Sequence, residues 1–212
     1  MVGAGLYVQV GCGLCAPEGW RNFDASPRLR VERMVGIGSV LALTTGRLFP
    51  DNAEFGDVRA ALPVGTGTAD GVYASHVLEH LSRADVPVAL AEMYRMLRAG
   101  GILRLIVPDL AARAERYRRE GDADAFMRSL NMAGAARARG LGGRTRAALG
   151  LSGHRWMYDE VSMGAVLGEA GFCGIRRCAF GDSGDPMFAR VEDRGRFFHD
   201  GGPELAMQAM KP

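Results

Sequence analysis

A glycine-rich turn near the start of the chain is the first feature whose residue types suggest binding chemistry. In GLYVQVGCGLCAPEGWRNFDASP, residues 6–10 form an apolar run of strand length, and the Gly-Cys-Gly of residues 11–13 interrupts it. Residues 20–24 follow as a second strand-like stretch that ends on Asp24. Glycines let a backbone approach a ligand closely, and an acid on the next strand accepts hydrogen bonds from ribose hydroxyls. This order predicts a cradle for a nucleotide-like ligand.

The residues after this turn argue against a dinucleotide. Gly11, Gly13 and Ala16 satisfy the loose glycine pattern of dinucleotide-binding proteins. That pattern also needs a helix directly after the turn, because the amino end of the helix holds the pyrophosphate. Pro17 and Gly19 prevent a helix there. A nicotinamide oxidoreductase is therefore disfavoured, and a ligand without phosphates, such as S-adenosylmethionine, fits the turn better.

Other polar residues also follow strand-like stretches. The residues at these predicted strand ends are Asp57, Ser75, His76 and Asp109. Helical segments separate the strands, and the alternation predicts a mostly parallel sheet with helices on its faces. Ligands of such sheets bind beyond the carboxyl ends of the strands. We therefore expect these residues and the glycine turn to converge.

Two helices are marked by their boundaries. Asp85 is expected to cap the first, which ends at Gly100 and Gly101. The second is capped by Asp159 and ends at Gly171. Residues 27–53 are interpreted as a loop with one brief helix.

An arginine-rich helical stretch lies between these two helices. It covers residues 110–146 and ends in RARGLGGRTR. We expect one domain over residues 1–212, with a helical lid at about 110–155. The alternative for the charged stretch is an ordinary solvated helix face.

Composition excludes several classes of protein. The 212 residues are 48% hydrophobic and 24% charged, and the net charge is +2. This balance is typical of an ordinary globular domain and gives no overall attraction to nucleic acid. No stretch approaches the ~18 consecutive apolar residues of a membrane span. The start of the chain shows no secretion signal, so a cytoplasmic location is expected.

The four cysteines are interpreted as reduced thiols. They form two close pairs, a spacing that also occurs in zinc sites and redox dithiols. One pair lies in the glycine turn and the other flanks a predicted strand; the residues are Cys12, Cys15, Cys173 and Cys178. No ligand spacing in the sequence requires a metal, and none is expected; a divalent metal near Asp109 or Glu79 stays open as an alternative.

Four ordered segments carry a resemblance to a known family. They are VQVGCGLCAPEGWRNFDASP, FGDVRAALPVGTGTADGVYASHVLEHL, MYRMLRAGGILRLIVPDL and HRWMYDEVSMGAVLGEAGF. They resemble the class I S-adenosylmethionine-dependent methyltransferases, most of all the small bacterial type-11-like branch with Gly-Trp-x-Asn-x-Asp after the glycine turn. The resemblance implies a three-layer Rossmann-like fold with seven strands, the last of them antiparallel and formed by ELAMQAMKP. The chain departs from the broader superfamily because it lacks the helix that usually follows the glycine turn.

The resemblance also implies roles for individual residues. Gly11, Cys12 and Gly13 would wrap the methionine part of S-adenosylmethionine, and Asp24 would bind the ribose hydroxyls. Asp57 and Val58 would border the adenine, and Ser75 and His76 would face the methyl group. As alternatives, Asp24 and Asp57 would only cap their loops.

Methyl transfer to a hydroxyl requires a group that removes its proton. His154, in SGHRWMYD, is the leading candidate for this general base because it lies between the predicted lid and a clear helix. His76 is the second candidate. The alternative is that His154 and Trp156 form a packing corner.

The acceptor is expected to be a sugar or glycan hydroxyl, which the resemblance favours. Trp156, Tyr158 and Asp109 are the candidate substrate-binding residues, since aromatic faces stack on sugar rings. Two alternatives stay open: methylation of a small aromatic or lipid metabolite in a pocket of Met34, Val40, Leu41 and Leu43, and a non-catalytic module that only binds S-adenosylmethionine. The oligomeric state is undetermined, with a homodimer as one option.

Overall fold

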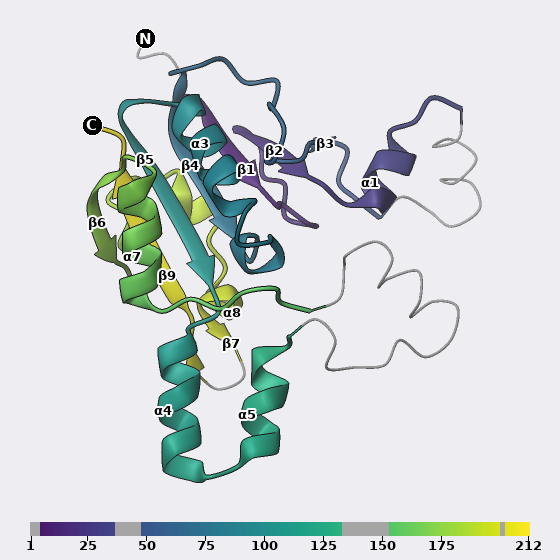
Figure 1. Cartoon of the computed structure of the whole chain (residues 1–212). Helices are drawn as coiled ribbons and strands as arrows, with labels where there is room; N and C mark the ends of the chain where they lie inside the picture. The colour runs from purple at the N-terminus through teal and green to yellow at the C-terminus, as the bar shows by residue number, and fades with distance from the viewer. Residues whose placement is uncertain (1–4, 37–47, 133–152, 200–201) are drawn as a thin grey trace.

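The computed structural model describes residues 5–36, 48–132, 153–199 and 202–212 (Figure 1). Its centre is a seven-stranded sheet with the strand order β3-β2-β1-β4-β5-β9-β6. The strands are β1 (Tyr7–Val10), β2 (Trp20–Asp24), β3 (Ala53–Phe55), β4 (Ala69–Ser75), β5 (Leu97–Val107), β6 (Cys173–Arg177) and β9 (Leu205–Met210). A separate two-stranded sheet pairs β7 (Phe198–His199) with β8 (Gly202–Pro203).

The helices follow the alternation that the sequence predicts. They are α1 (Pro27–Glu32), α3 (Val86–Met96), α4 (Leu110–Glu120), α5 (Ala123–Leu130), α7 (Glu160–Glu169) and α8 (Arg194–Phe197). Two short 3₁₀ turns add η1 (Leu78–His80) and η2 (Phe188–Arg190). No helix in the described part of the chain is long and apolar enough to cross a membrane.

Strand direction confirms the predicted fold class. β3, β2, β1, β4 and β5 pair in parallel, whereas β9 pairs antiparallel with both β5 and β6. The antiparallel strand is the ELAMQAMKP segment expected to play this part. The strand order reverses between β1 and β4, which is where open sheets of this kind bind ligands.

The sheet is buried on both faces. On one face, Val72 and Leu105 pack with apolar residues of α3 and α7. On the other, Tyr73 and Ile106 pack with Phe188 and residues close to it in space. Successive side chains of a strand point to opposite faces, so each central strand contributes to both cores. The result is the three-layer arrangement expected for the fold.

The boundary between α3 and β5 differs from the prediction. The helix ends at Met96 and the strand begins at Leu97, although Gly100 and Gly101 were expected to end the helix. Leu97 pairs with Ala69 of β4, so the chain enters the sheet directly from the helix. Gly100, at φ +73°, then bends the strand from within it. The helix therefore ends earlier than the Gly100-Gly101 pair predicts, because the chain pairs with β4 from Leu97 onward.

Of the two predicted caps, only one forms. Asp85 stands at the N-cap position of α3 but its side chain makes no capping hydrogen bond, because its Oδ2 accepts from Ser82 Oγ at 2.7 Å instead. Asp159 caps α7 in a capping box with Ser162, as predicted, and Gly171 follows at φ +91°. α4 and α5 form a hairpin that projects beyond the carboxyl edge of the sheet (Figure 1). The rest of the expected lid, including residues 137–146, falls in 133–152, outside the described residues. The same holds for residues 37–47.

Candidate functional site

The glycine turn after β1 has the backbone geometry that requires glycine. Gly11 and Gly13 adopt φ of +68° and +56°, the left-handed region that side chains disfavour. A Cβ at Gly11 would lie 2.4 Å from Val77 Cγ2, just after β4. The turn is therefore packed tightly against the end of the neighbouring strand, at the point where the strand order reverses.

Asp24 is held at the end of β2 by two backbone amides. Gly13 N donates to its Oδ2 at 2.9 Å, and Ser26 N donates to its Oδ1 at 2.8 Å. These bonds fix the carboxylate next to the glycine turn. A carboxylate has about four acceptor positions, so both oxygens can still accept further hydrogen bonds.

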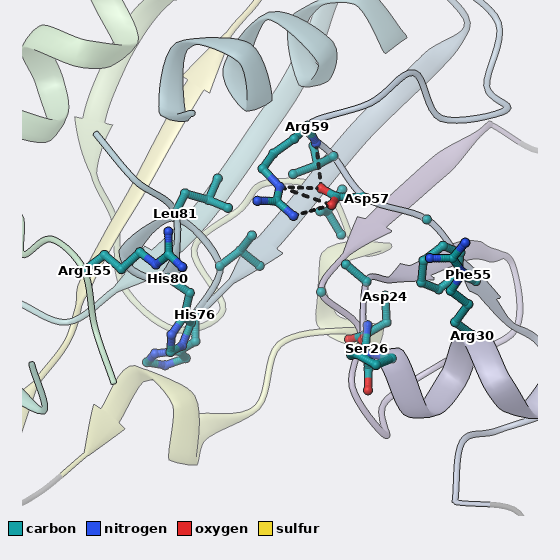
Figure 2. A pocket seen from close by; sticks show the side chains of 17 residues that line it. Asp24, Ser26, Arg30, Phe55, Asp57, Arg59, His76, His80, Leu81 and Arg155 are labelled. Atoms are coloured by element: carbon teal, nitrogen blue, oxygen red, sulfur yellow. Dashed lines mark hydrogen bonds and ion pairs between the residues drawn. The ribbon is translucent and has the colours of Figure 1, made fainter. Parts of the chain in front are cut away.

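A cavity of about 650 Å³ opens beside this turn, and we name it the cofactor cavity (Figure 2). Its lining includes five residues that the resemblance assigned to cofactor binding: Gly11, Asp24, Asp57, Val58 and His76. They come from the ends of four strands or from the loops directly after them. The predicted convergence at the carboxyl edge of the sheet is therefore present for these residues.

Asp57 is already engaged by a neighbour. Arg59 donates to its carboxylate through Nε and Nη2, with the shortest contact at 2.6 Å (Figure 2). The Arg59 hydrogen bonds hold the pKa of Asp57 below its usual value. Arg59 N also donates to Asp57 Oδ1 at 2.9 Å, so the carboxylate caps its own loop while the residue lines the cavity.

Three residues assigned to the cofactor lie behind the cavity rather than in its lining. Cys12 is buried, and burial raises the pKa of its thiol to about 12, which leaves it protonated and inert. Gly13 N is turned to Asp24. Ser75 is buried at the end of β4, and its Oγ has no hydrogen-bond partner.

A second cavity, of about 330 Å³, lies next to the first. Its lining consists mostly of polar and charged residues: His76, Pro108, Arg113, Ser129, Asn131, His154, Gly195, Arg196 and Glu204. His76 lines both cavities. The two catalytic candidates, His76 and His154, therefore share the second cavity although they lie far apart in the sequence.

His154 is oriented by a backbone carbonyl. Its Nδ1 lies 2.8 Å from Leu130 O, an atom that only accepts, so this nitrogen carries the proton. The neutral ring then has its lone pair on Nε2. Burial lowers the pKa of His154, and the neighbouring His80 acts in the same direction.

His76 is held at both ring nitrogens. Nδ1 faces Glu79 Oε1 at 3.1 Å and Nε2 faces Arg196 O at 3.2 Å. Burial alone would lower the pKa of His76, but the hydrogen bond and charge of Glu79 raise it overall. Because both of its neighbours are acceptors, His76 is less free than His154 to take a proton from an acceptor molecule. Its φ of +54° is uncommon for a residue with a side chain.

The predicted substrate-binding residues line neither cavity. Tyr158 is fully buried in the main apolar core. Trp156 lies at the surface with Arg83 over its ring, 5.8 Å from the centroid. Asp109 caps α4 through Ala112 N and pairs with Arg177 at 2.7 Å. These positions lend no support to a contact with substrate.

Two residues of the second cavity were not identified from the sequence. Arg113 of α4 forms a bidentate pair with Glu204, both contacts at 2.9 Å, and both side chains are buried. Glu204 directly precedes β9, whose antiparallel direction brings it to the carboxyl edge of the sheet. No local pattern marks this pair, because its partners are separated by 91 positions.

Comparison with known proteins agrees with this geometry. A family model described as a methyltransferase domain matches residues 39–105. No curated protein resembles the chain closely enough to count as a match.

Solved structures share the fold. An S-adenosylmethionine-dependent methyltransferase from Thermotoga maritima, described as a possible histamine N-methyltransferase, is 15% identical with a TM-score of 0.51; 98% of this chain and 82% of that chain are covered. A methyltransferase from Archaeoglobus fulgidus is 14% identical with a TM-score of 0.52, covering 99% and 87%.

A phosphoethanolamine N-methyltransferase from Haemonchus contortus, solved with phosphomonomethylethanolamine and S-adenosylhomocysteine, is 10% identical with a TM-score of 0.50. The match covers 98% of this chain and 49% of that one, so the chain spans about half of that protein's length. The methyltransferase domain matched over residues 39–105 supports a methyltransferase whose methyl donor is S-adenosylmethionine, and the solved structures show that the chain has the fold of such enzymes.

Proposed function

We propose that this methyltransferase methylates a hydroxyl of a sugar or glycan. In this proposal the donor occupies the cofactor cavity and the acceptor occupies the second cavity. The observation that carries it is His76, which lines both cavities and so marks where donor and acceptor meet. We also propose that the chain belongs to the methyltransferase branch that carries Gly-Trp-x-Asn-x-Asp after the glycine turn. Residues 1–212 would form a single domain with a lid at about 110–155.

The cofactor cavity fits a nucleoside with a charged tail. Its volume of about 650 Å³ falls in the usual range of small-molecule sites. We assign the ribose hydroxyls to Asp24, whose oxygens retain free acceptor positions beside the glycine turn. Asp57 and Val58 would border the adenine, and Gly11 with Gly13 the methionine part.

The second cavity favours a polar acceptor. Arg113, Glu204, Ser129 and Asn131 lie in its lining and make it polar, and the amide of Asn131 and the hydroxyl of Ser129 are groups able to hydrogen-bond a hydroxyl. An aromatic or lipid acceptor would need an apolar pocket. Of the residues that were weighed for such a pocket, Met34 is exposed, and Val40, Leu41 and Leu43 fall outside the described residues.

We assign activation of the acceptor hydroxyl to His154. Its Nδ1 is fixed on Leu130 O, so the Nε2 lone pair is the chemically free atom of the ring. His76 would position donor and acceptor rather than react. When bound, S-adenosylmethionine supplies a methyl group on a good leaving group, so the remaining task of the protein is alignment and activation of the hydroxyl.

Two measurements test this proposal. Calorimetry should show binding of S-adenosylhomocysteine and none of NAD. Incubation with isotopically labelled S-adenosylmethionine and a panel of sugars, phenols and amines should then label a sugar hydroxyl. Label in a phenol or amine alone would favour the small-metabolite alternative, and binding without transfer to any acceptor would favour a non-catalytic module.

A further inference from the structure

Three side chains with metal-ligand chemistry converge between the two cavities. Glu79 and His80 lie in η1, directly after β4, and His154 lies in the segment before α7. One ligand atom from each lies within 4.8 Å of the other two. His80 lines the cofactor cavity and His154 lines the second cavity, so the cluster sits at their junction.

Both histidines present the same ring nitrogen to the cluster. His154 Nδ1 faces Leu130 O at 2.8 Å, and His80 Nδ1 faces Gly153 O at 3.3 Å. Carbonyl oxygens only accept, so both Nδ1 atoms carry protons and both Nε2 atoms have free lone pairs. Metal-binding histidines are typically oriented in this way by a carbonyl or carboxylate on the other nitrogen.

Glu79 completes the arrangement with an unused buried oxygen. Its side chain is almost fully buried. Oε1 accepts a hydrogen bond from His76 Nδ1 at 3.1 Å, whereas Oε2 has no hydrogen-bond partner. A buried carboxylate oxygen without a partner is costly unless a cation or proton donor reaches it. His80 Nε2 lies 3.9 Å from Oε1, the oxygen that also accepts from His76, so Oε2 is the carboxylate oxygen left without a partner.

The backbone also holds the cluster together. Arg155 N and Trp156 N donate to Glu79 O at 2.7 and 3.3 Å. These bonds tie the segment that carries His154 to the turn that carries Glu79 and His80. Two sequence-distant segments are thus fixed against each other at the position of the ligands.

We propose that Glu79, His80 and His154 bind a divalent transition-metal ion, of which zinc is the representative. Two imidazoles and one carboxylate form a set that suits zinc and similar ions better than magnesium or calcium, which prefer oxygen ligands. Metal–ligand bonds of about 2.0–2.2 Å require ligand atoms roughly 3–3.5 Å apart. Side-chain rotations that move these atoms by about 1 Å bring them to that spacing. Three protein ligands leave a coordination position open.

Because the metal site lies between the two cavities, we assign it the activation of the acceptor hydroxyl, an assignment that rests on the proposed function. A hydroxyl that coordinates such an ion has a lowered pKa, so the acceptor is activated where it faces the donor. In the overall reaction the acceptor O–H bond breaks and its proton leaves to water. An O–C bond forms to the methyl carbon, and the S–C bond breaks with its electron pair remaining on sulfur. With its Nε2 on the ion, His154 does not take the proton itself; holding the ion replaces its role as general base, and the loss of His154 still removes activation of the hydroxyl.

Calorimetric titration of zinc chloride into the metal-free, cofactor-free protein tests the site. The parent should bind one ion tightly. Loss of a group that only orients a ligand already costs about 10–100-fold in affinity, so His80→Ala, His154→Ala and Glu79→Gln should each weaken binding by roughly that factor or more. His199→Ala, which changes the histidine of β7, serves as the control and should bind as the parent does. Circular dichroism and a melting curve without metal establish that each variant is folded.

The outcomes separate this proposal from the proposed function. A parent that binds no zinc, or folded variants that all bind as tightly as the parent, would overturn the metal site. Neither result affects the binding of S-adenosylhomocysteine, which is measured separately. Conversely, a protein that binds zinc through these residues but no S-adenosylhomocysteine would retain the site and refute the cofactor assignment.

Discussion

Two clusters of buried charge in this molecule are built in opposite ways. Arg104, on β5, donates to Glu192 at 2.7 Å, to Gln208 at 2.7 Å and to Asp182 at 3.0 Å, so its guanidinium is well supplied with acceptors. Glu79, at the carboxyl edge of the sheet, has one buried oxygen without a partner, beside two histidines with free nitrogens. The first cluster lies among packed elements and the second between two cavities.

This difference teaches how to distinguish structural from functional charge. A satisfied buried network is costly to break and has no capacity left for a ligand. An under-satisfied network beside a cavity has less stability to lose and can still bind a ligand. The predictions below test whether the two clusters divide in this way.

The largest effect is expected on turnover at His154. His154→Ala should lower kcat by about 10²–10⁴-fold, because the group that activates the acceptor is removed. Affinity for S-adenosylhomocysteine should stay near that of the parent. Steady-state kinetics and calorimetry measure the two quantities, with His199→Ala as the matched control. Parental turnover in the His154 variant would remove His154 from the mechanism and leave His76 as the candidate.

The next effect is on stability at the satisfied cluster. Glu192→Gln should lower the free energy of unfolding by about 1.5–3 kcal/mol, because it removes one of the two carboxylates that pair with buried Arg104 while Asp182 remains. Glu79→Gln in metal-free protein should cost clearly less, since one oxygen of Glu79 has no partner to lose. Urea unfolding of both variants measures the contrast. Equal losses would show that the two clusters are alike.

A third effect is expected on cofactor affinity at Asp24. Asp24→Ala should weaken binding of S-adenosylhomocysteine at least tenfold, about 1.4 kcal/mol, because it removes charge-assisted hydrogen bonds to the ribose. Asp24→Asn keeps one acceptor oxygen for the glycine turn and separates loss of charge from loss of the turn. Unchanged affinity in calorimetry for both variants would mean that the ribose lies elsewhere.

The smallest effect concerns pH at the edge of the satisfied cluster. Although burial raises the pKa of Asp182, hydrogen bonds from Arg176 and Arg104 lower it to about 2. The folded-state pKa lies below the unfolded one, so this stabilisation is present above about pH 4 and is lost as the pH falls toward 2. The difference in unfolding free energy between the parent and Asp182→Asn should therefore shrink from pH 7 to pH 3. It will be small, because Asp182 is partly exposed to solvent. A difference that grows on acidification would contradict the assigned shift.

Much of the cofactor side could be predicted because it depends on local order. Strand-length apolar runs, glycines that need left-handed φ and an acid at the next strand end placed Gly11 and Asp24 together. The parallel sheet then brought Asp57 and His76 to the same edge. Each of these expectations needs only the residue pattern and the rule that parallel strands end on one side.

The acceptor side could not be predicted in the same way. Asp109 was expected to contact substrate, but the structure uses its carboxylate as a helix cap and as the partner of Arg177. Tyr158 is buried in the apolar core, and the ring of Trp156 lies under the guanidinium of Arg83. Their residue types suit sugar binding, yet side-chain direction depends on the packing of α7 and the segment before it.

The sequence alone thus determined the alternation of strands and helices, the antiparallel last strand, the glycine turn with Asp24, and the family to which the motifs point. The alternation and the glycine turn follow from periodicity and from residues whose backbone preferences act within a few positions, whereas the antiparallel direction of the last strand was implied by the resemblance to known methyltransferases. Only the tertiary structure decided that His80 and Glu79 meet His154, that Arg113 pairs with Glu204, and that His76 joins two cavities. Such contacts join residues far apart in the chain, and their geometry is set by how helices and loops pack onto the edge of the sheet.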